Sequence, residues 1–263
     1  MYKKSIRLGE KEVLLLSALE HDKQQAFSFD DAAKILSDAS RQSVRNILSR
    51  LAKKERITRV KRGIYLLVPF KQSGSAQYSL SIAPLLAEEY YISFWSALSF
   101  HGLTNQLPSC VFAAVRKPKK ERVFQNTRYK FVVLSKRYFF GFDEVELAGG
   151  KVKIASIEKT ALDCLLHPEY CGGLGEIAKA LQNYGKTFDW KKMRSCLSRL
   201  GNSAVERRLR YCLRFLKMKK QLAILGKKEC RGFRKLDPNS QKKGNYDKEL
   251  GVIINIDLGE EMR

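Results

Sequence analysis

A run of basic side chains between Ser40 and Gly63 is the part of the sequence whose residue types point most directly to a chemistry. The run holds nine Lys or Arg residues and a single acid, Glu55. An Arg side chain can fork onto guanine, Gln and Asn can pair with adenine, and Ser and Lys can hold phosphate. We therefore predict that these residues contact DNA: Arg41, Gln42, Arg45, Asn46, Ser49, Arg50, Lys53, Arg59, Lys61 and Arg62.

Patterns for catalysis and metal binding are weak by comparison. A nucleotidyltransferase needs Gly-Ser followed by paired Asp-x-Asp carboxylates that hold two metal ions, and Gly74-Ser75 has no such pair downstream. Cys164, His167 and Cys171 lie close together in the sequence, but a structural zinc site needs four ligands. We predict no enzymatic activity, no catalytic residue, no bound metal and no cofactor.

Three helices are expected to position the basic run. Apolar residues at helical spacing indicate a first helix over residues 9–22. Ser28, with Asp31 three positions later, is suited to cap a second helix, and Ser40 is a plausible N-cap for a third. A buried stripe in the third helix would turn its basic and amide side chains outward. The residues of this stripe are Val44, Ile47, Leu48 and Leu51.

Two short β-prone segments follow, over residues 57–60 and 63–68. They are joined by Lys61-Arg62-Gly63, where the glycine permits a tight turn. Three helices and a basic hairpin indicate a winged helix-turn-helix over residues 1–70. Its third helix would enter the major groove, and its hairpin would lie along the backbone or in the minor groove. The alternative is a winged helix that binds protein.

The charge of the whole chain also indicates a polyanionic partner. Its 263 residues carry 50 Lys or Arg against 27 Asp or Glu, a formal net charge of +23. Nucleic acid is the simplest partner for such an excess of positive charge. The alternative is that the proteome as a whole is basic and that this protein has no polyanionic partner. Six cysteines without paired spacing indicate reduced thiols. No signal-peptide pattern and no apolar run of roughly 18 residues is present, so we expect a soluble, cytoplasmic protein without membrane contact.

A larger second domain is expected after a linker over residues 71–80, which follows Pro69 and contains Gly74. Residues 81–263 begin with an apolar helical stretch and continue with strand-like pieces and helices. The expected strands cover residues 110–115, 129–135, 139–148 and 151–156, with a late strand near 252–256. The fold class is therefore mixed α/β (α+β), with an N-terminal winged helix-turn-helix before a larger mixed α/β domain.

Basic residues are also dense between 191 and 235, which leaves open a contact with RNA or further DNA. A helix opened by a Ser203/Glu206 capping box is the centre of this segment. Its basic side chains are Arg207, Arg208, Arg210, Arg214, Lys217, Lys219 and Lys220. By contrast, Asp163 and Glu169 flank the end of an apolar helix. They are either satisfied surface charges or part of a segment that defines the fold, and we favour a structural role.

Several segments resemble the AbiEi family of antitoxins, over nearly the whole chain. They are "FWSALSFHGLT" (94–104), "IASIEKTALDCLLHPEYCGGLGEIAKAL" (154–181), "ERRLRYCLRFL" (206–216) and "RKLDPNSQKKGNYDKELGVIINID" (234–257), with "RGIY" (62–65) at the wing. The resemblance implies a transcriptional repressor and antitoxin of a phage-defence (abortive infection) operon. It would bind inverted repeats in the promoter of its own operon and counteract a nucleotidyltransferase toxin, directly or indirectly.

Two other functions remain compatible with the sequence. One is a winged-helix regulator whose second domain, residues 81–263, serves only oligomerisation or protein docking. The other is an RNA- or tRNA-binding protein that uses the basic C-terminal half.

Overall fold

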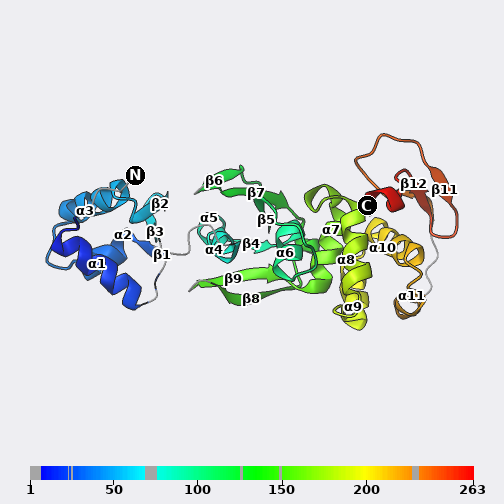
Figure 1. Ribbon diagram of the computed structural model, residues 1–263, viewed down its shortest axis with the longest axis horizontal. Coiled ribbons are helices and arrows are strands. Elements are labelled where there is room, and N and C mark those ends of the chain that lie inside the picture. The colour runs from blue at the N-terminus through cyan, green and yellow to red at the C-terminus, as the bar shows by residue number, and fades with distance from the viewer. Residues whose placement is uncertain are drawn as a thin grey trace. The chain divides into compact units, whose positions relative to one another are not determined.

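The computed structural model of the chain describes residues 7–22, 24, 26–68, 76–124, 127–147, 150–226 and 231–263 (Figure 1). The chain divides into two compact units. The first contains Met1–Glu88 and Glu144–Val152, and the second contains Glu89–Asp143 and Lys153–Arg263. The class is mixed α/β, with a mainly helical N-terminal part and a larger part built on sheets, as predicted.

The N-terminal part holds three helices and a small antiparallel sheet of strand order β1-β3-β2. Three helices followed by a hairpin is the arrangement expected of a winged helix-turn-helix. Strand β1 was not predicted from the sequence. The elements are α1 (Glu10–His21), β1 (Ala26–Ser28), α2 (Phe29–Ile35), α3 (Arg41–Lys53), β2 (Ile57–Lys61) and β3 (Ile64–Leu67).

Two serine caps fix where α2 and α3 begin, because each satisfies a backbone N–H that the helix itself leaves free. The Ser28 hydroxyl accepts a hydrogen bond from the Asp31 N–H at 3.1 Å, and the Asp31 carboxylate accepts one from the Ser28 N–H at 2.8 Å. The Ser40 hydroxyl accepts a hydrogen bond from the Ser43 N–H at 3.2 Å. Both caps are confirmed.

The apolar stripe of α3 forms the centre of the N-terminal core. Val44, Ile47, Leu48 and Leu51 are at most 3% exposed, as predicted, and they belong to one cluster with Leu15 and Leu19 of α1. Truncating a buried leucine in such a core typically costs about 2–5 kcal/mol. The stripe therefore fixes which side of α3 faces outward.

The predicted linker over residues 71–80 is only partly described. Residues 71–75, which include Gly74, lie outside the described residues, as does Pro69. Residues 76–80 are helical, in α4 (Ala76–Ser81), and α5 (Ala83–Leu86) follows.

A six-stranded mixed sheet of order β6-β7-β5-β4-β9-β8 is the framework of the C-terminal part. Strands β5 and β7 are parallel, and β4 pairs with β5 antiparallel and with β9 parallel. The four strands predicted between residues 110 and 156 are present. The six strands are β4 (Tyr90–Ile92), β5 (Cys110–Val115), β6 (Arg122–Phe124), β7 (Thr127–Val133), β8 (Phe142–Leu147) and β9 (Gly150–Ala155).

Helices and a second small sheet complete this part. Helix α7 contacts α6, α8, α9 and α10, so it is the centre of the helical layer. The sheet has the order β10-β12-β11. These helices are α6 (Phe94–Phe100), α7 (Ile157–Leu166), α8 (Leu174–Tyr184), α9 (Trp190–Leu200), α10 (Ser203–Phe215), α11 (Lys219–Leu225) and α12 (Leu258–Glu261), with 3₁₀ turns at Lys136–Tyr138 and Pro168–Tyr170. The strands are β10 (Arg234–Lys235), β11 (Asn245–Asp247) and β12 (Val252–Ile254).

The expected cap of α10 is wrong, and one of the two interpretations of Asp163 is excluded. Asn202, rather than Ser203, caps α10, because its side-chain oxygen accepts hydrogen bonds from the N–H groups of Ala204 and Val205. Asp163 is not a surface charge, because its side chain is 0% exposed. Across the described ranges, no helix combines the length and the apolar character that a membrane span requires.

Candidate nucleic-acid interface

All ten residues predicted to contact DNA are exposed. Seven of them lie on α3 or at its ends, and Arg59, Lys61 and Arg62 lie on β2 and in the turn that follows it. The structure therefore keeps each of these side chains free of the core. It divides them, however, into groups with different neighbours.

Three of the residues predicted to contact DNA form a chain of hydrogen bonds along α3. Arg45 Nη1 donates to Gln42 Oε1 at 3.2 Å, and Gln42 Nε2 donates to Asn46 Oδ1 at 3.3 Å. These bonds link residues three and four positions apart, which share one face of a helix. A guanidinium and two amides thus line one exposed strip, the set of donors and acceptors that base edges in a major groove can satisfy.

Helix α2 supports one edge of this strip. The Arg41 guanidinium lies 4.9 Å from the centroid of the Phe29 ring and pairs with the Asp30 carboxylate at 3.2 Å. The Arg45 guanidinium also lies over Phe29, at 5.7 Å. Cation–π contacts of this kind add about 0.5–1 kcal/mol at exposed sites, so they orient both arginines without burying them.

Arg50 belongs to a different group, because it is tied to α1. Its Nε donates to Oε1 of Glu12 at 3.1 Å, and Lys54 Nζ donates to Oε2 of the same carboxylate at 2.5 Å. The Glu12 side chain is 2% exposed and that of Arg50 is 58% exposed. Arg50 therefore holds α3 on α1 with one edge of its guanidinium and presents the rest to solvent.

Glu12 and Lys54 were missed by sequence reasoning. Glu12 also accepts a hydrogen bond from the Gly9 N–H at 2.9 Å, as the acid of a capping box does. Sequence rules look for Ser or Thr at the first position of that box, and glycine stands there instead. The position of Glu12 three residues after Gly9 was the available signal.

The turn of the wing presents the other three basic residues. Lys61 pairs with Ile64 across the hairpin, so Arg62 and Gly63 form the turn, and Gly63 adopts a φ of 77°. A positive φ favours glycine, which is consistent with the turn predicted there. The strand register shifts between Arg59 and Lys61, and both side chains are exposed. A basic tip of this kind suits phosphate groups.

A buried polar cluster on α7 was tested as a possible second site. The Asp163 carboxylate accepts hydrogen bonds from Tyr91 Oη at 3.0 Å and Ser93 Oγ at 2.7 Å, and it forms an ion pair with Lys159. Lys159 Nζ also donates to Tyr91 Oη at 2.8 Å. Burial, with the negative charge of Asp163, raises the pKa of Tyr91 well above its ordinary value. All four side chains are 0% exposed, so the cluster supports the fold and meets no ligand from solvent.

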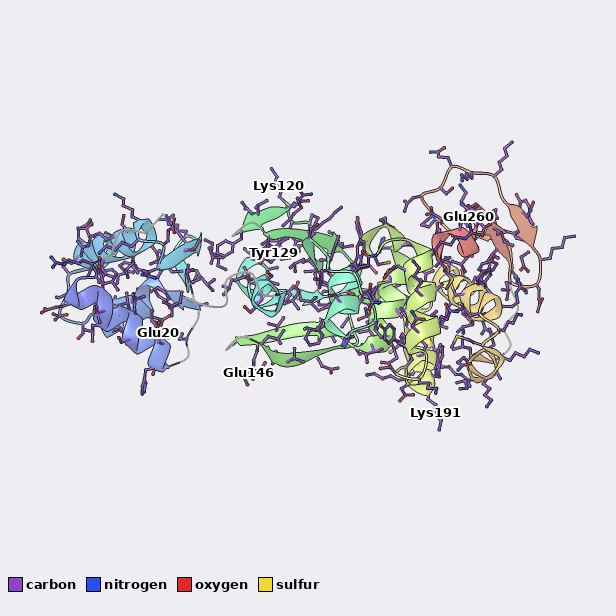
Figure 2. The ribbon with its side chains drawn as sticks, viewed as in Figure 1. Glu20, Lys120, Tyr129, Glu146, Lys191 and Glu260 are labelled. Atoms are coloured by element: carbon purple, nitrogen blue, oxygen red, sulfur yellow. The ribbon has the colours of Figure 1, made fainter. Side chains whose placement is uncertain are left out.

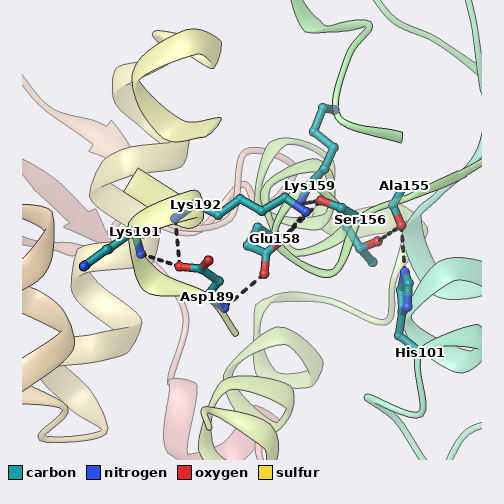
Figure 3. A network of polar contacts seen from close by, with 9 residues as sticks. His101, Ala155, Ser156, Glu158, Lys159, Asp189, Lys191 and Lys192 are labelled. Atoms are coloured by element: carbon teal, nitrogen blue, oxygen red, sulfur yellow. Dashed lines mark hydrogen bonds and ion pairs between the residues drawn. The ribbon is translucent and has the colours of Figure 1, made fainter. Parts of the chain in front are cut away.

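The start of α7 is held by a neighbouring network (Figure 3). Glu158 accepts hydrogen bonds from the Ser156 hydroxyl at 3.2 Å and the Asp189 N–H at 3.1 Å, and pairs with Lys192 at 3.3 Å. His101 Nε2 lies 2.7 Å from the Ala155 carbonyl oxygen. Burial lowers the pKa of His101, so a neutral ring that donates to this carbonyl is favoured. These contacts join α6, α7 and α9.

The cysteines and histidine considered for zinc lie in the core or pair elsewhere. Cys171 Sγ lies 3.7 Å from the Cys164 carbonyl oxygen, and both cysteines are buried. His167 pairs with Glu169 at 3.2 Å. Within the part of the chain that the structure describes, no group of three or more His, Cys, Asp or Glu residues is placed to hold a metal ion.

Three arginines of α10, which the sequence suggested as part of a surface for nucleic acid, are buried in the structure. Arg207, Arg208 and Arg210 are 5–7% exposed and donate to backbone carbonyl groups instead. Arg210 also pairs with Glu206 at 2.9 Å. A guanidinium has five donors, which makes it suited to binding several carbonyl oxygens that would otherwise be unsatisfied. These three residues are therefore unavailable to RNA or DNA.

Part of the chain matches a known protein family. Residues 15–68 match a family described as "Transcriptional regulator, AbiEi antitoxin". Over residues 15–68 the resemblance to the AbiEi antitoxins is confirmed. Of the segments that carried it, only 62–65 lies within this range. The matched range contains α2, α3 and the whole hairpin, and thus all ten residues predicted to contact DNA.

The fold of the chain also resembles a solved structure. That structure is the RV2827C protein from Mycobacterium tuberculosis, with a TM-score of 0.68 and 11% sequence identity over 95% of this chain and 92% of that one. The similarity thus includes the part that follows the AbiEi match, as a likeness of fold. No curated protein matches the sequence.

Proposed function

We propose that the protein is a DNA-binding repressor and antitoxin that controls its own operon. The AbiEi match supports the coarser description of an antitoxin and transcriptional regulator. The observation that carries the DNA-binding part is the exposed Arg45–Gln42–Asn46 strip on α3 within the matched residues. The strip has the donors and acceptors to read base edges, and the wing tip has the cations to hold phosphate.

The operator in this proposal is a pair of inverted repeats in the promoter of the operon. A helix of 13 residues such as α3 is long enough to cross a major groove, with the hairpin on the adjacent backbone or minor groove. The protein would counter a nucleotidyltransferase toxin encoded beside it, by contact or indirectly. This second activity rests on the AbiEi resemblance, and residues 81–263 would carry it.

A reporter assay tests the repressor part. The promoter upstream of the gene drives a reporter, and wild-type protein is expected to repress it. The double variant Arg45→Ala/Asn46→Ala removes two members of the strip and should restore expression. Lys191→Ala, which removes an exposed charge on α9 (Figure 2), should repress like wild type. Equal repression by the double variant and wild type would contradict the proposal.

The antitoxin part is tested separately by co-expression with the adjacent gene. Rescue of growth by wild type and by Arg45→Ala/Asn46→Ala alike would show that neutralisation does not depend on the α3 strip. If no neighbouring gene is toxic and repression persists, the protein is a regulator whose second part serves docking or oligomerisation. The same variants thus separate this alternative from the first proposal.

The alternative of RNA binding through the basic C-terminal half has lost part of its support. Arg207, Arg208 and Arg210 are buried and donate hydrogen bonds to backbone carbonyl groups. Any RNA surface in this half must therefore use other residues.

A further inference from the structure

Figure 1 shows the small sheet β10-β12-β11 near the C-terminus of the chain. An exposed aromatic pair lies at this sheet, with Tyr246 in β11 and Phe233 directly before β10. The Phe233 and Tyr246 rings meet edge to face, with centroids 4.9 Å apart and an interplanar angle of 88°. Phe233 is 37% exposed and Tyr246 is 64% exposed. Two aromatic rings in contact usually belong to a core, whereas these present their remaining surface to solvent.

The register of the sheet explains why the pair points outward. Lys235, Ile253 and Tyr246 are partners across the three strands, so they share one face of the sheet. Val252 and Asp247 lie on the opposite face, where Val252 is buried and Asp247 forms an ion pair with Arg214 of α10. The face that carries Tyr246 is thus turned away from α10.

The backbone beneath the pair is fixed by Arg207 of α10. Its Nη1 donates to the Gly232 carbonyl at 2.7 Å and to the Gly251 carbonyl at 2.9 Å, and its Nη2 donates to the Arg231 carbonyl at 2.7 Å. Gly232 directly precedes Phe233. The buried guanidinium therefore clamps the segment that carries Phe233 to the loop before β12. An exposed ring on a clamped backbone loses little conformational entropy when it binds a ligand.

The surroundings of the pair are strongly basic. Residues 231–249 contain six Lys or Arg and three acids, Asp237, Asp247 and Glu249, and Arg214 pairs with both Asp247 and Glu249. The six basic side chains are all exposed: Arg231, Arg234, Lys235, Lys242, Lys243 and Lys248. Lys235 shares the sheet face of Tyr246, whereas Arg234 pairs with Val252 and lies on the opposite face. The surface thus combines exposed π faces with an excess of cations.

We propose that this surface binds an unpaired strand of nucleic acid, with a base stacked on the Phe233–Tyr246 pair and the phosphates held by exposed Lys and Arg side chains of residues 231–248. Stacking on exposed aromatic side chains of a sheet, inside a basic rim, is how proteins commonly hold single strands. A duplex keeps its bases paired and stacked, so it offers no free π face. The carboxylates of an acidic protein pair with the cations but do not stack on the two rings. An unpaired strand of nucleic acid offers both phosphates and free base faces.

Binding must be measured so that stacking is separated from charge, because a chain of net charge +23 attracts any polyanion. The full-length protein is titrated into a fluorescein-labelled 12-nucleotide oligouridine, with anisotropy as the readout. The matched control ligand is the abasic ribose-phosphate strand of the same length, which keeps every phosphate and lacks the bases. Wild-type protein should bind the base-bearing strand about tenfold more tightly or better, since stacking of one base contributes that much.

Variants of the pair assign this preference to the two rings. Tyr246→Ala should bind both strands with equal affinity, while Tyr246→Phe, which keeps the ring and removes the hydroxyl, should bind like wild type. Phe233→Ala should reduce the preference in the same way. Tyr246 is largely exposed, so its replacement should leave the thermal unfolding midpoint unchanged. Leu107→Ala, an 84% exposed residue outside this sheet, is the control for loss of exposed apolar surface.

Three results would overturn the proposal. One is an equal affinity of wild type for the base-bearing and abasic strands. Another is a preference that survives in the double variant Phe233→Ala/Tyr246→Ala. The third is a loss of affinity for poly-glutamate, but not for oligouridine, when Tyr246 becomes Ala, which would assign the surface to an acidic protein.

Discussion

Glu12 on α1 and Arg50 on α3 are joined by a hydrogen bond of 3.1 Å, although the two residues lie 38 positions apart in the sequence. The carboxylate is buried, and Lys54 donates to its second oxygen. A buried acid that holds two cations of one helix fixes the rotation of that helix on its support. The orientation of the Arg45–Gln42–Asn46 strip therefore depends on a residue that never meets DNA.

Glu12→Gln should loosen α3 and weaken DNA binding indirectly. The amide leaves Arg50 and Lys54 without an ionic partner, and a lost hydrogen bond to a charged group costs about 1.5–3 kcal/mol. Backbone amides of α3 should exchange with deuterium faster, by the factor that corresponds to this free energy. The exchange rates of the α9 amides should not change. Glu20→Gln, an exposed acid on the same helix (Figure 2), is the matched control and should exchange like wild type. Identical α3 exchange in the two variants would contradict the role of Glu12.

Acid should loosen the same helix. Burial raises the pKa of Glu12, but hydrogen bonds from Lys54, the Gly9 N–H and Arg50 outweigh burial and hold the pKa below its ordinary value of 4.5. A carboxyl group whose pKa is depressed by folding stabilises the folded state above its unfolded pKa, and this contribution is lost as the pH falls through the folded pKa. Protection of α3 amides should therefore be constant near neutral pH and decrease below about pH 4.5.

The Glu12→Gln variant isolates the contribution of Glu12 to this acid response. Hydrogen bonds to Ser28 lower the pKa of Asp31 as well, so some acid sensitivity should remain in the variant. The difference between wild type and variant should shrink as the pH falls below 4.5. A difference that stays constant between neutral and acid pH would show that the charge of Glu12 does not act on α3.

The capped and periodic elements of the fold were predictable from the sequence, whereas the shortest strands were not. Ser28 and Ser40 begin their helices as expected, and β5 occupies the predicted residues. Strand β4 was hidden within an apolar stretch interpreted as helix. Its three residues are all buried, and a short, fully buried strand has no alternation to distinguish it from a helix.

Side-chain direction was predictable on α3 and not on α10. The apolar stripe of α3 determines its exposed face, and all the residues assigned to that face are exposed. Arg50 was assigned correctly to the surface, but its partner Glu12 comes from another helix and leaves no local pattern. Arg207 on α10 was assigned to solvent because arginine is rarely buried. Its burial depends on three carbonyl groups of distant loops, which no spacing along the helix reveals.

The wing should contribute to DNA affinity in a way that does not depend on sequence. Lys61→Ala/Arg62→Ala should weaken binding to the operator and to random duplex alike, because contacts to phosphate carry no base information. Each lost phosphate contact reduces the slope of log K against log salt by about 0.9, so the double variant should lose roughly 1.8. Anisotropy titrations at several salt concentrations measure this slope. An unchanged slope would exclude the wing tip from the interface.

Arg45→Ala should instead discriminate between DNA sequences. A good contact from Arg to a base edge contributes about 1–3 kcal/mol of discrimination against the wrong base. Affinity for the operator should therefore fall by tenfold or more, while affinity for random duplex changes little. Arg50→Ala is the informative comparison, because its Nε already serves Glu12. If Arg50→Ala lost more operator preference than Arg45→Ala, Arg50 rather than the Arg45–Gln42–Asn46 strip would be the main reader of the bases.

Lys159→Met should destabilise the C-terminal part by about 3–5 kcal/mol, because it leaves the Asp163 carboxylate buried without its cation. Urea denaturation followed by circular dichroism measures the effect. The double variant Lys159→Met/Asp163→Asn removes the buried charge along with its partner, while Asn keeps an acceptor for Tyr91 and Ser93. It should therefore recover part of the lost stability. Lys191→Ala, which removes an exposed lysine, should unfold within about 0.5 kcal/mol of wild type. If Lys159→Met unfolded like wild type, the ion pair would contribute nothing, and the network around Tyr91 would have to stabilise α7 without it.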